Sequence, residues 1–173
     1  MRLLLLFILF LALNNCSKMK PEDYKDTKPV IKIEDYFQGN VKAWGMLQTR
    51  SGEVKRQFVA DMKGEFDGQN LILDETFIWN DGERQERRWN IKKIGDNKYE
   101  GTAPDVVGVA KGVSFGSAFK FEYQLLVPYK DTKIKIRFDD WIFKQDEKTA
   151  INKATLTKFG FKVGELTVFF VKN

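Results

Sequence analysis

Nine residues, Phe119-Lys-Phe-Glu-Tyr-Gln-Leu-Leu-Val127, place an apolar or aromatic side chain at every odd-numbered position. Polar side chains occupy most of the even-numbered positions between them. A period of two is the pattern of a β-strand that buries one face and exposes the other. The segment therefore predicts a half-buried strand of an antiparallel sheet.

The same alternation extends along the chain in both directions. Apolar side chains share one face in residues 54–62, 71–79, 89–91, 134–138 and 166–171. Turn signals separate these runs at Asp67-Gly68, Asp81-Gly82, 95–97, Lys130-Asp131 and Gly160. The pattern predicts about nine or ten strands joined as hairpins in one antiparallel meander. Because so long a sheet must curl or split, we expect an all-β closed barrel, with a two-sheet β-sandwich as the alternative.

Length and composition limit the kind of protein. The chain has 173 residues, 43% of them hydrophobic and 31% charged, which suits one buried domain that we place at residues 37–173. It contains no histidine and a single cysteine, Cys16. These counts exclude Ser-His-Asp and Cys-His nucleophiles, histidine-ligated zinc or haem, and disulfide scaffolds. We therefore expect no metal and no cofactor.

The N-terminus has the pattern of an export signal. Arg2 precedes an uninterrupted apolar run at residues 3–13, which is shorter than the roughly 20 residues that span a bilayer. Residues 1–15 are therefore predicted to be a signal peptide. The stretch Leu13-Asn-Asn-Cys16 resembles a bacterial lipobox, which implies that Cys16 is lipidated and becomes the first mature residue. It departs from the lipobox pattern at Asn15, where Gly, Ala or Ser is usual.

A lipidated Cys16 would make a membrane the first partner of the protein. Ser17, in place of an inner-membrane retention Asp, favours the periplasmic face of the outer membrane; a soluble periplasmic protein and an uncleaved anchor are the alternatives. Residues 16–36 are charged and contain Pro21 and Pro29, so they are predicted to be a flexible tether. The net charge of +5 has interspersed signs, which predicts no nucleic-acid partner.

Matching the apolar faces across the turns predicts hairpin registers, because a slip of one residue would turn the apolar set to water. In the first hairpin, a two-residue Asp67-Gly68 turn would pair Phe58 with Phe77 and Met62 with Leu73.

In the second hairpin, a three-residue loop, Asn80-Asp-Gly82, places Glu75 opposite Arg87. A two-residue Lys130-Asp131 turn later places Asp140 opposite Phe121 on the same inward face.

These registers direct Arg56, Glu75, Arg87 and Asp140 into the barrel. Charges there are costly unless paired, so Glu75 and Arg87 are the expected ion pair. The favoured interpretation is a structural network that fixes register. The alternatives are the polar floor of a ligand cavity and a carboxylate pair for hydrolysis, which would combine Glu75 with Asp140 or Asp105.

Two further features could concern binding. Trp141 falls on the outward face of its strand and is the candidate for a surface contact. Residues 101–118 are rich in glycine, alanine and serine, which indicates either a sharp bend of the barrel wall or a ligand-contacting loop.

An ordered series of short motifs runs from about Phe37 to the C-terminus. It comprises Ala43-Trp-Gly45, Arg56-Gln-Phe58, Leu73-Asp-Glu-Thr-Phe77, Arg87-Arg-Trp89, Asp105-Val-Val-Gly108, Phe138-Asp-Asp-Trp141, Asn152-Lys-Ala154 and Val163-Gly-Glu165. In this series the chain resembles the bacterial lipoprotein family called domain of unknown function 3833. The resemblance implies an envelope lipoprotein with a lipocalin-like barrel, and it implies no substrate.

Three functions follow from this reading. The first is a non-enzymatic binding module for an apolar or lipid-like ligand or an envelope protein partner, which fits a membrane-anchored barrel without recognisable catalytic groups. The second is a carboxylate-dependent hydrolase, which needs two acids in one cavity that solvent reaches. The third is a purely structural envelope protein.

Overall fold

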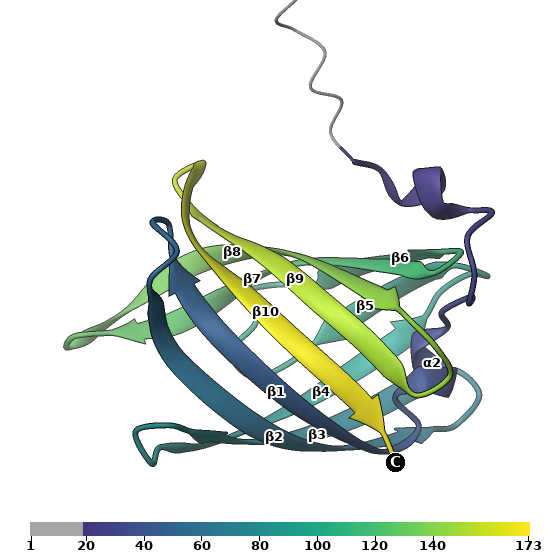
Figure 1. The fold of residues 1–173 in the computed structure, drawn as a ribbon, viewed down its shortest axis with the longest axis horizontal. Helices are drawn as coiled ribbons and strands as arrows, with labels where there is room; N and C mark the ends of the chain where they lie inside the picture. Colours follow the sequence, from purple (N-terminus) through teal and green to yellow (C-terminus); the bar gives the residue numbers. More distant parts are fainter. Residues whose placement is uncertain (1–18) are drawn as a thin grey trace, which may run out of the picture.

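The computed structural model describes residues 19–173. Within that range the chain forms ten antiparallel strands that close into one barrel, in which β1 also pairs with β10 (Figure 1). The strands are β1 (Gly39–Thr49), β2 (Val54–Phe66), β3 (Asn70–Trp79), β4 (Arg84–Lys93), β5 (Lys98–Thr102), β6 (Ala110–Phe115), β7 (Ala118–Tyr129), β8 (Thr132–Lys144), β9 (Thr149–Lys158) and β10 (Phe161–Lys172).

The single closed sheet confirms the predicted all-β meander barrel. Along β2 and β7 buried and exposed side chains alternate, as the period of two requires. Buried residues from the strands form a core that fills one end of the barrel interior, together with residues from the segment before β1. The sandwich alternative does not apply, because β10 pairs with both β1 and β9.

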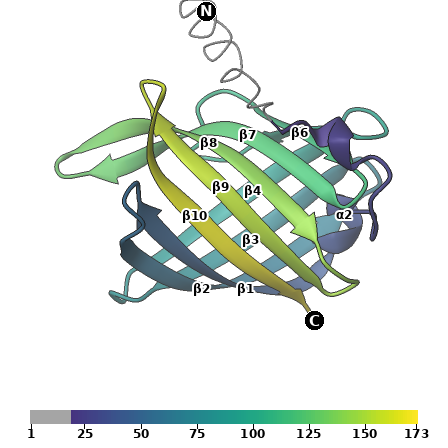
Figure 2. The same cartoon turned by 45° about the horizontal axis from the view of Figure 1, so that its top comes forward.

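The segment before β1 covers one end of the barrel. It contains a 3-10 helix, η1 (Pro21–Tyr24), and a one-turn α-helix, α2 (Ile33–Tyr36), which lies across the barrel end (Figures 1 and 2). Ile31 and Ile33 are each only 1% exposed. We call this the closed end and the other, where the β1–β2, β3–β4 and β7–β8 connections lie, the open end.

Residues 19–36, for which the sequence predicts a flexible tether, instead dock on the barrel, from η1 through α2. The Ile31 amide donates a hydrogen bond to the Gly116 carbonyl at 2.8 Å, and the Ser114 hydroxyl donates to the Ile31 carbonyl at 2.6 Å. The physical reason is that a barrel end exposes core side chains, and a short apolar segment nearby can bury them. The predicted signal peptide at residues 1–15 and Cys16 lie outside the described residues.

The first hairpin register differs from the prediction by two residues. Phe58 pairs with Trp79 and Met62 with Glu75, so the inward face is kept but the partners shift. The reason lies at Asp67, whose carboxylate accepts hydrogen bonds from the Gln69 and Asn70 backbone amides. Asp67 is therefore the first residue of the turn and not one of its two central residues. Aspartate is favoured at this first position of tight turns.

The registers of the β3–β4 hairpin, which is the second hairpin, and of the β7–β8 hairpin agree with the prediction. Glu75 pairs with Arg87 across the three-residue loop, and Gly82 has a φ of 87°, which favours glycine. Asp140 pairs with Phe121.

Among residues 19–173, no helix is both long and apolar enough to cross a bilayer.

Candidate functional site: a barrel cavity with a polar centre

The barrel encloses a cavity of about 530 Å³, a size typical of small-molecule sites. Ile33 and Phe37 line it at the closed end, and both are buried. At the open end the lining residues Glu83, Leu126 and Val163 are exposed, so the cavity reaches solvent there. It is therefore a one-ended pocket.

Aromatic and aliphatic side chains form most of the wall. The aromatic lining residues are Phe37, Phe58, Phe77, Trp79, Trp89, Phe119, Phe121, Tyr123, Phe138 and Phe170. Many of these rings contact one another, as in the stacked pair of Tyr123 and Phe138, whose ring centroids are 5.2 Å apart. Such a wall favours an apolar guest.

The glycine-rich stretch, residues 101–118, forms part of this wall. A Cβ atom at Gly101 would lie 2.6 Å from the Phe121 ring, and one at Gly112 would lie 2.8 Å from the Phe119 ring. Both glycines therefore let an aromatic ring pack directly on the backbone. The following loop, residues 103–109, carries Asp105 into the cavity. The stretch thus shapes the wall, and its loop lines the cavity.

Arg87, on β4, is the only cation that lines the described cavity away from its mouth. It binds Asp105 in a bidentate contact, with Nη2–Oδ2 at 2.7 Å and Nε–Oδ1 at 3.2 Å. Glu75 is more distant, with 3.7 Å between Nη1 and Oε2. The predicted Glu75–Arg87 pair therefore exists, but Asp105 is the tighter partner of the guanidinium.

Glu75, on β3, is 8% exposed and lines the cavity. Burial raises the pKa of its carboxyl to about 7, against the opposing effect of the Arg87 charge. Its Oε2 atom has no hydrogen-bond donor. Glu75 is thus a poorly solvated acid poised near neutral pH.

A second set of polar side chains lies on the opposite wall, on β8 and β9. Asp140 is 9% exposed, and its Oδ2 accepts a hydrogen bond of 2.7 Å from the Tyr123 hydroxyl. Burial raises the pKa of Asp140 to about 7, and the Tyr123 hydrogen bond opposes this rise. Asn152, 3% exposed, also lines the cavity here. Asp140 Oδ1 and Asn152 Oδ1 both lack a hydrogen bond.

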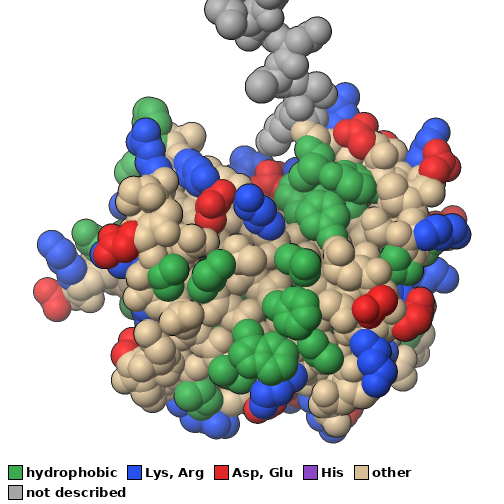
Figure 3. Space-filling model, in the orientation of Figure 1, with side chains coloured by type: hydrophobic (Ala, Val, Ile, Leu, Met, Phe, Trp, Pro, Cys, Tyr) green, Lys and Arg blue, Asp and Glu red, His purple; other side chains and the backbone are tan. Residues whose placement is uncertain are grey.

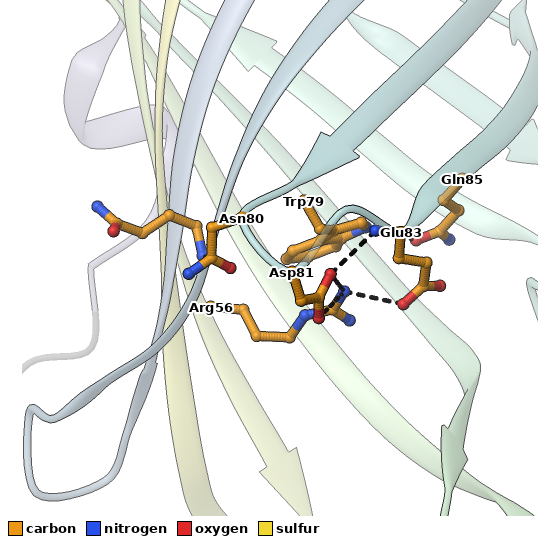
Figure 4. A network of polar contacts seen from close by, with 7 residues as sticks. Arg56, Trp79, Asn80, Asp81, Glu83 and Gln85 are labelled. Atoms are coloured by element: carbon orange, nitrogen blue, oxygen red, sulfur yellow. Dashed lines mark hydrogen bonds and ion pairs between the residues drawn. The ribbon is translucent and has the colours of Figure 1, made fainter.

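Arg56 stands at the mouth of the cavity (Figure 4). Its guanidinium lies over the Trp79 ring, 4.0 Å from the centroid, and Nη2 contacts Glu83 and Asp81 at 2.8 Å each. The Asp81 and Glu83 carboxylates are more than half exposed, so the Arg56 network belongs to the rim and is separate from the buried centre.

Trp141 is placed differently from its prediction. It does point out of the barrel, but it is only 7% exposed. The N-terminal segment covers it, with the Tyr24 ring centroid at 6.0 Å, and Phe143 stacks beside it at 6.1 Å. Trp141 is therefore not a free surface contact. The physical reason is the unforeseen docking of η1 on this part of the wall.

A row of exposed apolar side chains crosses the outer wall instead. We call Ile78, Val59, Trp44, Phe169 and Ile151 the outer row; each residue pairs with the next across adjacent strands, from β3 to β9. They are 36–46% exposed. Ile151 pairs next with Phe143, whose ring is 5.4 Å from that of Tyr24. In Figure 3, hydrophobic side chains gather over this face and beside the N-terminal segment.

The described residues offer no group of three or more Asp, Glu, His or Cys side chains placed to hold a metal ion. Of the interior charges, Arg87 and Asp105 are paired with one another, and Glu75 and Asp140 line the cavity.

A family model with the description "Protein of unknown function (DUF3833)" matches residues 10–172. The chain belongs to this family. The match confirms the resemblance of the ordered motifs, and the barrel agrees with the lipocalin-like fold that the resemblance implies. A comparison with curated proteins finds no match in sequence.

Two solved structures are similar to this member of the family. The S-type phycobiliprotein lyase CPES from Guillardia theta is 8% identical, with a TM-score of 0.59, over 90% of this chain and 98% of the lyase chain. The redesigned β-barrel mFAP1, solved with DFHBI, is 9% identical, with a TM-score of 0.44, over 82% of this chain and 100% of its own. The likeness to the lyase shows the fold alone.

The cavity unites most of the residues that the sequence singled out. Arg56, Glu75, Arg87, Asp105 and Asp140 all line it, whereas Trp141 does not. Sequence reasoning missed two members, Tyr123 and Asn152. Both lie on the inward face of their strands, so the alternation in β7 and β9 could have found them.

Proposed function

We propose that this protein is an envelope lipoprotein and a non-enzymatic binding module whose barrel holds one apolar, lipid-like molecule. The observation that carries the proposal is the cavity of about 530 Å³, lined mainly by aromatic and aliphatic side chains and open at one end. A barrel with a purely structural role has no need for so large an unfilled interior, because cavities cost stability.

The membrane part of the proposal rests on the start of the described chain and on the outer row. Met19 is three residues after Cys16, so a lipid on Cys16 would hold Met19 within about 10 Å of its attachment point. The Tyr24 hydroxyl contacts the Met19 sulfur, and the Tyr24 ring borders Phe143. An anchored barrel would therefore present the outer row beside the lipid surface, at the periplasmic face of the outer membrane.

Native mass spectrometry of the protein extracted with a mild detergent tests the binding function. We expect a population carrying one added mass in the range of a lipid, which organic extraction removes. A cavity variant, Ala43→Phe, places a ring in the lined interior and should lose the added mass. A protein without bound lipid that also fails to bind added apolar molecules would contradict the proposal, and co-purification of a stoichiometric envelope protein would favour the partner-binding alternative.

Vesicle flotation tests the membrane face separately from the anchor. In a Cys16→Ser background, the chain should float with anionic vesicles, and Trp44→Ser with Phe169→Ser should abolish flotation. Thr76, partly exposed on the same wall but outside the outer row, supplies the matched control Thr76→Ser. If the double variant floats as well as its parent, the outer row has no role at the membrane.

Hydrolysis is the second candidate, favoured by one specific observation. Glu75 and Asp140 line the same cavity, and burial raises the pKa of each to about 7, the range of general acid–base groups. Turnover of nitrophenyl esters or glycosides that both Glu75→Gln and Asp140→Asn abolish, and that Asp74→Asn on the outer wall retains, would support it. Absence of turnover across both substrate classes would contradict it.

A further inference from the structure

We propose that the ligand of the cavity carries a head group that donates hydrogen bonds, an ammonium or a hydroxyl, and that an anionic head is disfavoured. This inference rests on the proposed binding function and narrows it to a chemical class. It is carried by the unsatisfied acceptor atoms at the centre of the cavity and by the acidic groups that surround them.

Three buried oxygen atoms at the cavity centre lack hydrogen bonds. They are Glu75 Oε2, Asp140 Oδ1 and Asn152 Oδ1, from residues that are 8%, 9% and 3% exposed. All three residues line the cavity. Buried acceptors without donors cost free energy, and native proteins rarely leave several together. A guest that supplies donors would satisfy them.

Two donor groups of the centre, the Arg87 guanidinium and the Tyr123 hydroxyl, already bind carboxylates of the protein. Arg87 directs Nε and Nη2 to Asp105, at 2.7 Å for Nη2–Oδ2. The Tyr123 hydroxyl donates to Asp140 Oδ2. The third nitrogen of Arg87, Nη1, lies 3.7 Å from Glu75 Oε2. An anionic head, which can only accept hydrogen bonds, would therefore compete with Asp105 and Asp140 for these donors or lie beside the Glu75 carboxyl.

The charges at the cavity centre also disfavour an anionic head group. Three carboxyl groups, Glu75, Asp105 and Asp140, line the same cavity as the single Arg87 guanidinium, and the like charges of Asp105 and Asp140 raise the pKa of Glu75 in addition to its burial. An ammonium head would offset this excess of acidic groups. A carboxylate head would add a fourth acid to a poorly hydrated space, which is costly.

The pH dependence of binding follows from the groups that face the two acids. The pKa of Glu75 is affected by Arg87 and Trp89 from β4, by Asp105 from the 103–109 loop and by Asp140 from β8. The pKa of Asp140 is affected by Tyr123 from β7, by Asp139 from β8, by Asn152 from β9 and by Arg87. Because burial raises the pKa of both carboxyls to about 7, both are partly protonated at neutral pH. An ammonium head favours the ionised carboxylates, so its affinity should rise as pH increases from 6 to 8.

A matched ligand series tests the inference. Decylamine, decan-1-ol and decanoic acid share one chain and differ only in the head. Binding is followed by the fluorescence of Trp79 and Trp89, which line the cavity, in the full chain with Cys16→Ser, Trp44→Phe and Trp141→Phe. At pH 8 we expect the amine and the alcohol to bind at least about tenfold more tightly than the acid, as one to two added hydrogen bonds imply.

The two proposals fail in different ways. If decanoic acid binds as tightly as the amine and the alcohol, or more tightly, the head-group inference is wrong and the binding function stands. If none of the three binds, the binding function itself is wrong.

Substitutions locate the effect. Glu75→Gln and Asp140→Asn should each weaken decylamine binding about tenfold, remove its rise with pH, and leave decan-1-ol within about threefold of the parent. Asp74→Asn is the control, because Asp74 precedes Glu75 on β3 but faces outward and pairs with exposed Arg88. Decylamine affinity that is unchanged in both cavity variants, or reduced equally in the control, would overturn the assignment. Thermal melting shows that each variant is folded.

Discussion

Two buried glutamates, one at the closed end of the barrel and one at its centre, have opposite environments. Glu34, on α2, is 4% exposed; Lys93 Nζ contacts it at 2.6 Å and the Tyr99 hydroxyl donates to it at 2.8 Å. Burial alone would raise the pKa of Glu34, but these hydrogen bonds hold it below its usual value. Glu75 is almost as buried, and its pKa is raised.

The difference separates a fully hydrogen-bonded acid from an unsatisfied one within one barrel. At the closed end each oxygen of the acid has a donor, so Glu34 fixes α2 over the core. At the centre a carboxyl is buried beside open space with one oxygen unsatisfied. Unsatisfied buried acids with raised pKa values are the ones expected at binding or catalytic sites.

The largest expected effect is at the closed end. Glu34→Ala removes the shared acceptor of Lys93 and Tyr99 and leaves both donors unpaired beside the core. We expect a loss of about 3 kcal/mol in the free energy of unfolding. Urea denaturation at pH 7 measures it. A loss below about 1 kcal/mol would show that α2 does not depend on this acid.

The second effect is the pH dependence of stability from Glu75. Its folded-state pKa is raised from 4.5 to about 7, so the folded protein binds the proton more tightly and loses stability as pH rises between these values. From pH 5.5 to 8 this amounts to about 2 kcal/mol. Glu75→Gln should remove that part of the slope in urea titrations. Glu34→Gln should leave the slope unchanged, because the pKa of Glu34 is lowered and it stays ionised throughout this range.

A smaller effect is expected on the opposite wall of the cavity. Tyr123→Phe removes the donor to Asp140 Oδ2, which should cost about 1 kcal/mol and raise the pKa of Asp140 further. Carboxyl chemical shifts followed by NMR against pH would report the pKa. An Asp140 that titrates at a lower pH in the variant would contradict the assigned hydrogen bond.

The smallest effect is expected at the mouth. Arg56→Ala removes contacts with the exposed Asp81 and Glu83 and the stacking on Trp79, so we expect a loss below about 1 kcal/mol. Lys42→Ala, which breaks the exposed pair with Asp61, is the reference. A loss as large as that of Glu34→Ala would mean that the rim is part of the core.

The alternation of side chains was enough to predict the barrel and its inward charges. It placed Glu75 opposite Arg87 and Asp140 opposite Phe121, because each register had to keep a whole apolar face inside. It could not choose between registers two residues apart, since both keep that face inside. The Asp67 carboxylate made that choice in the first hairpin.

The closed end and the Asp105 contact were beyond the reach of periodicity. Ile31 and Ile33 lie in a charged segment without a sustained period, and their burial depends on the shape of the barrel end. Asp105 belongs to a loop, which follows no strand alternation, and it reaches Arg87 only because backbone hydrogen bonds to β7 direct the loop inward. Both depend on contacts between distant parts of the chain.

Closure of the sheet also determines when the protein can finish folding. The ladder that seals it joins Val41 to Lys172, nearly the full length of the barrel sequence, while every other ladder connects neighbours in the chain. Such a distant pairing has a high entropic cost before it forms and is expected to come late. Until β10 pairs, β1 and β9 each expose one unpaired backbone edge, so the twelve residues of β10 protect the molecule from strand-to-strand aggregation.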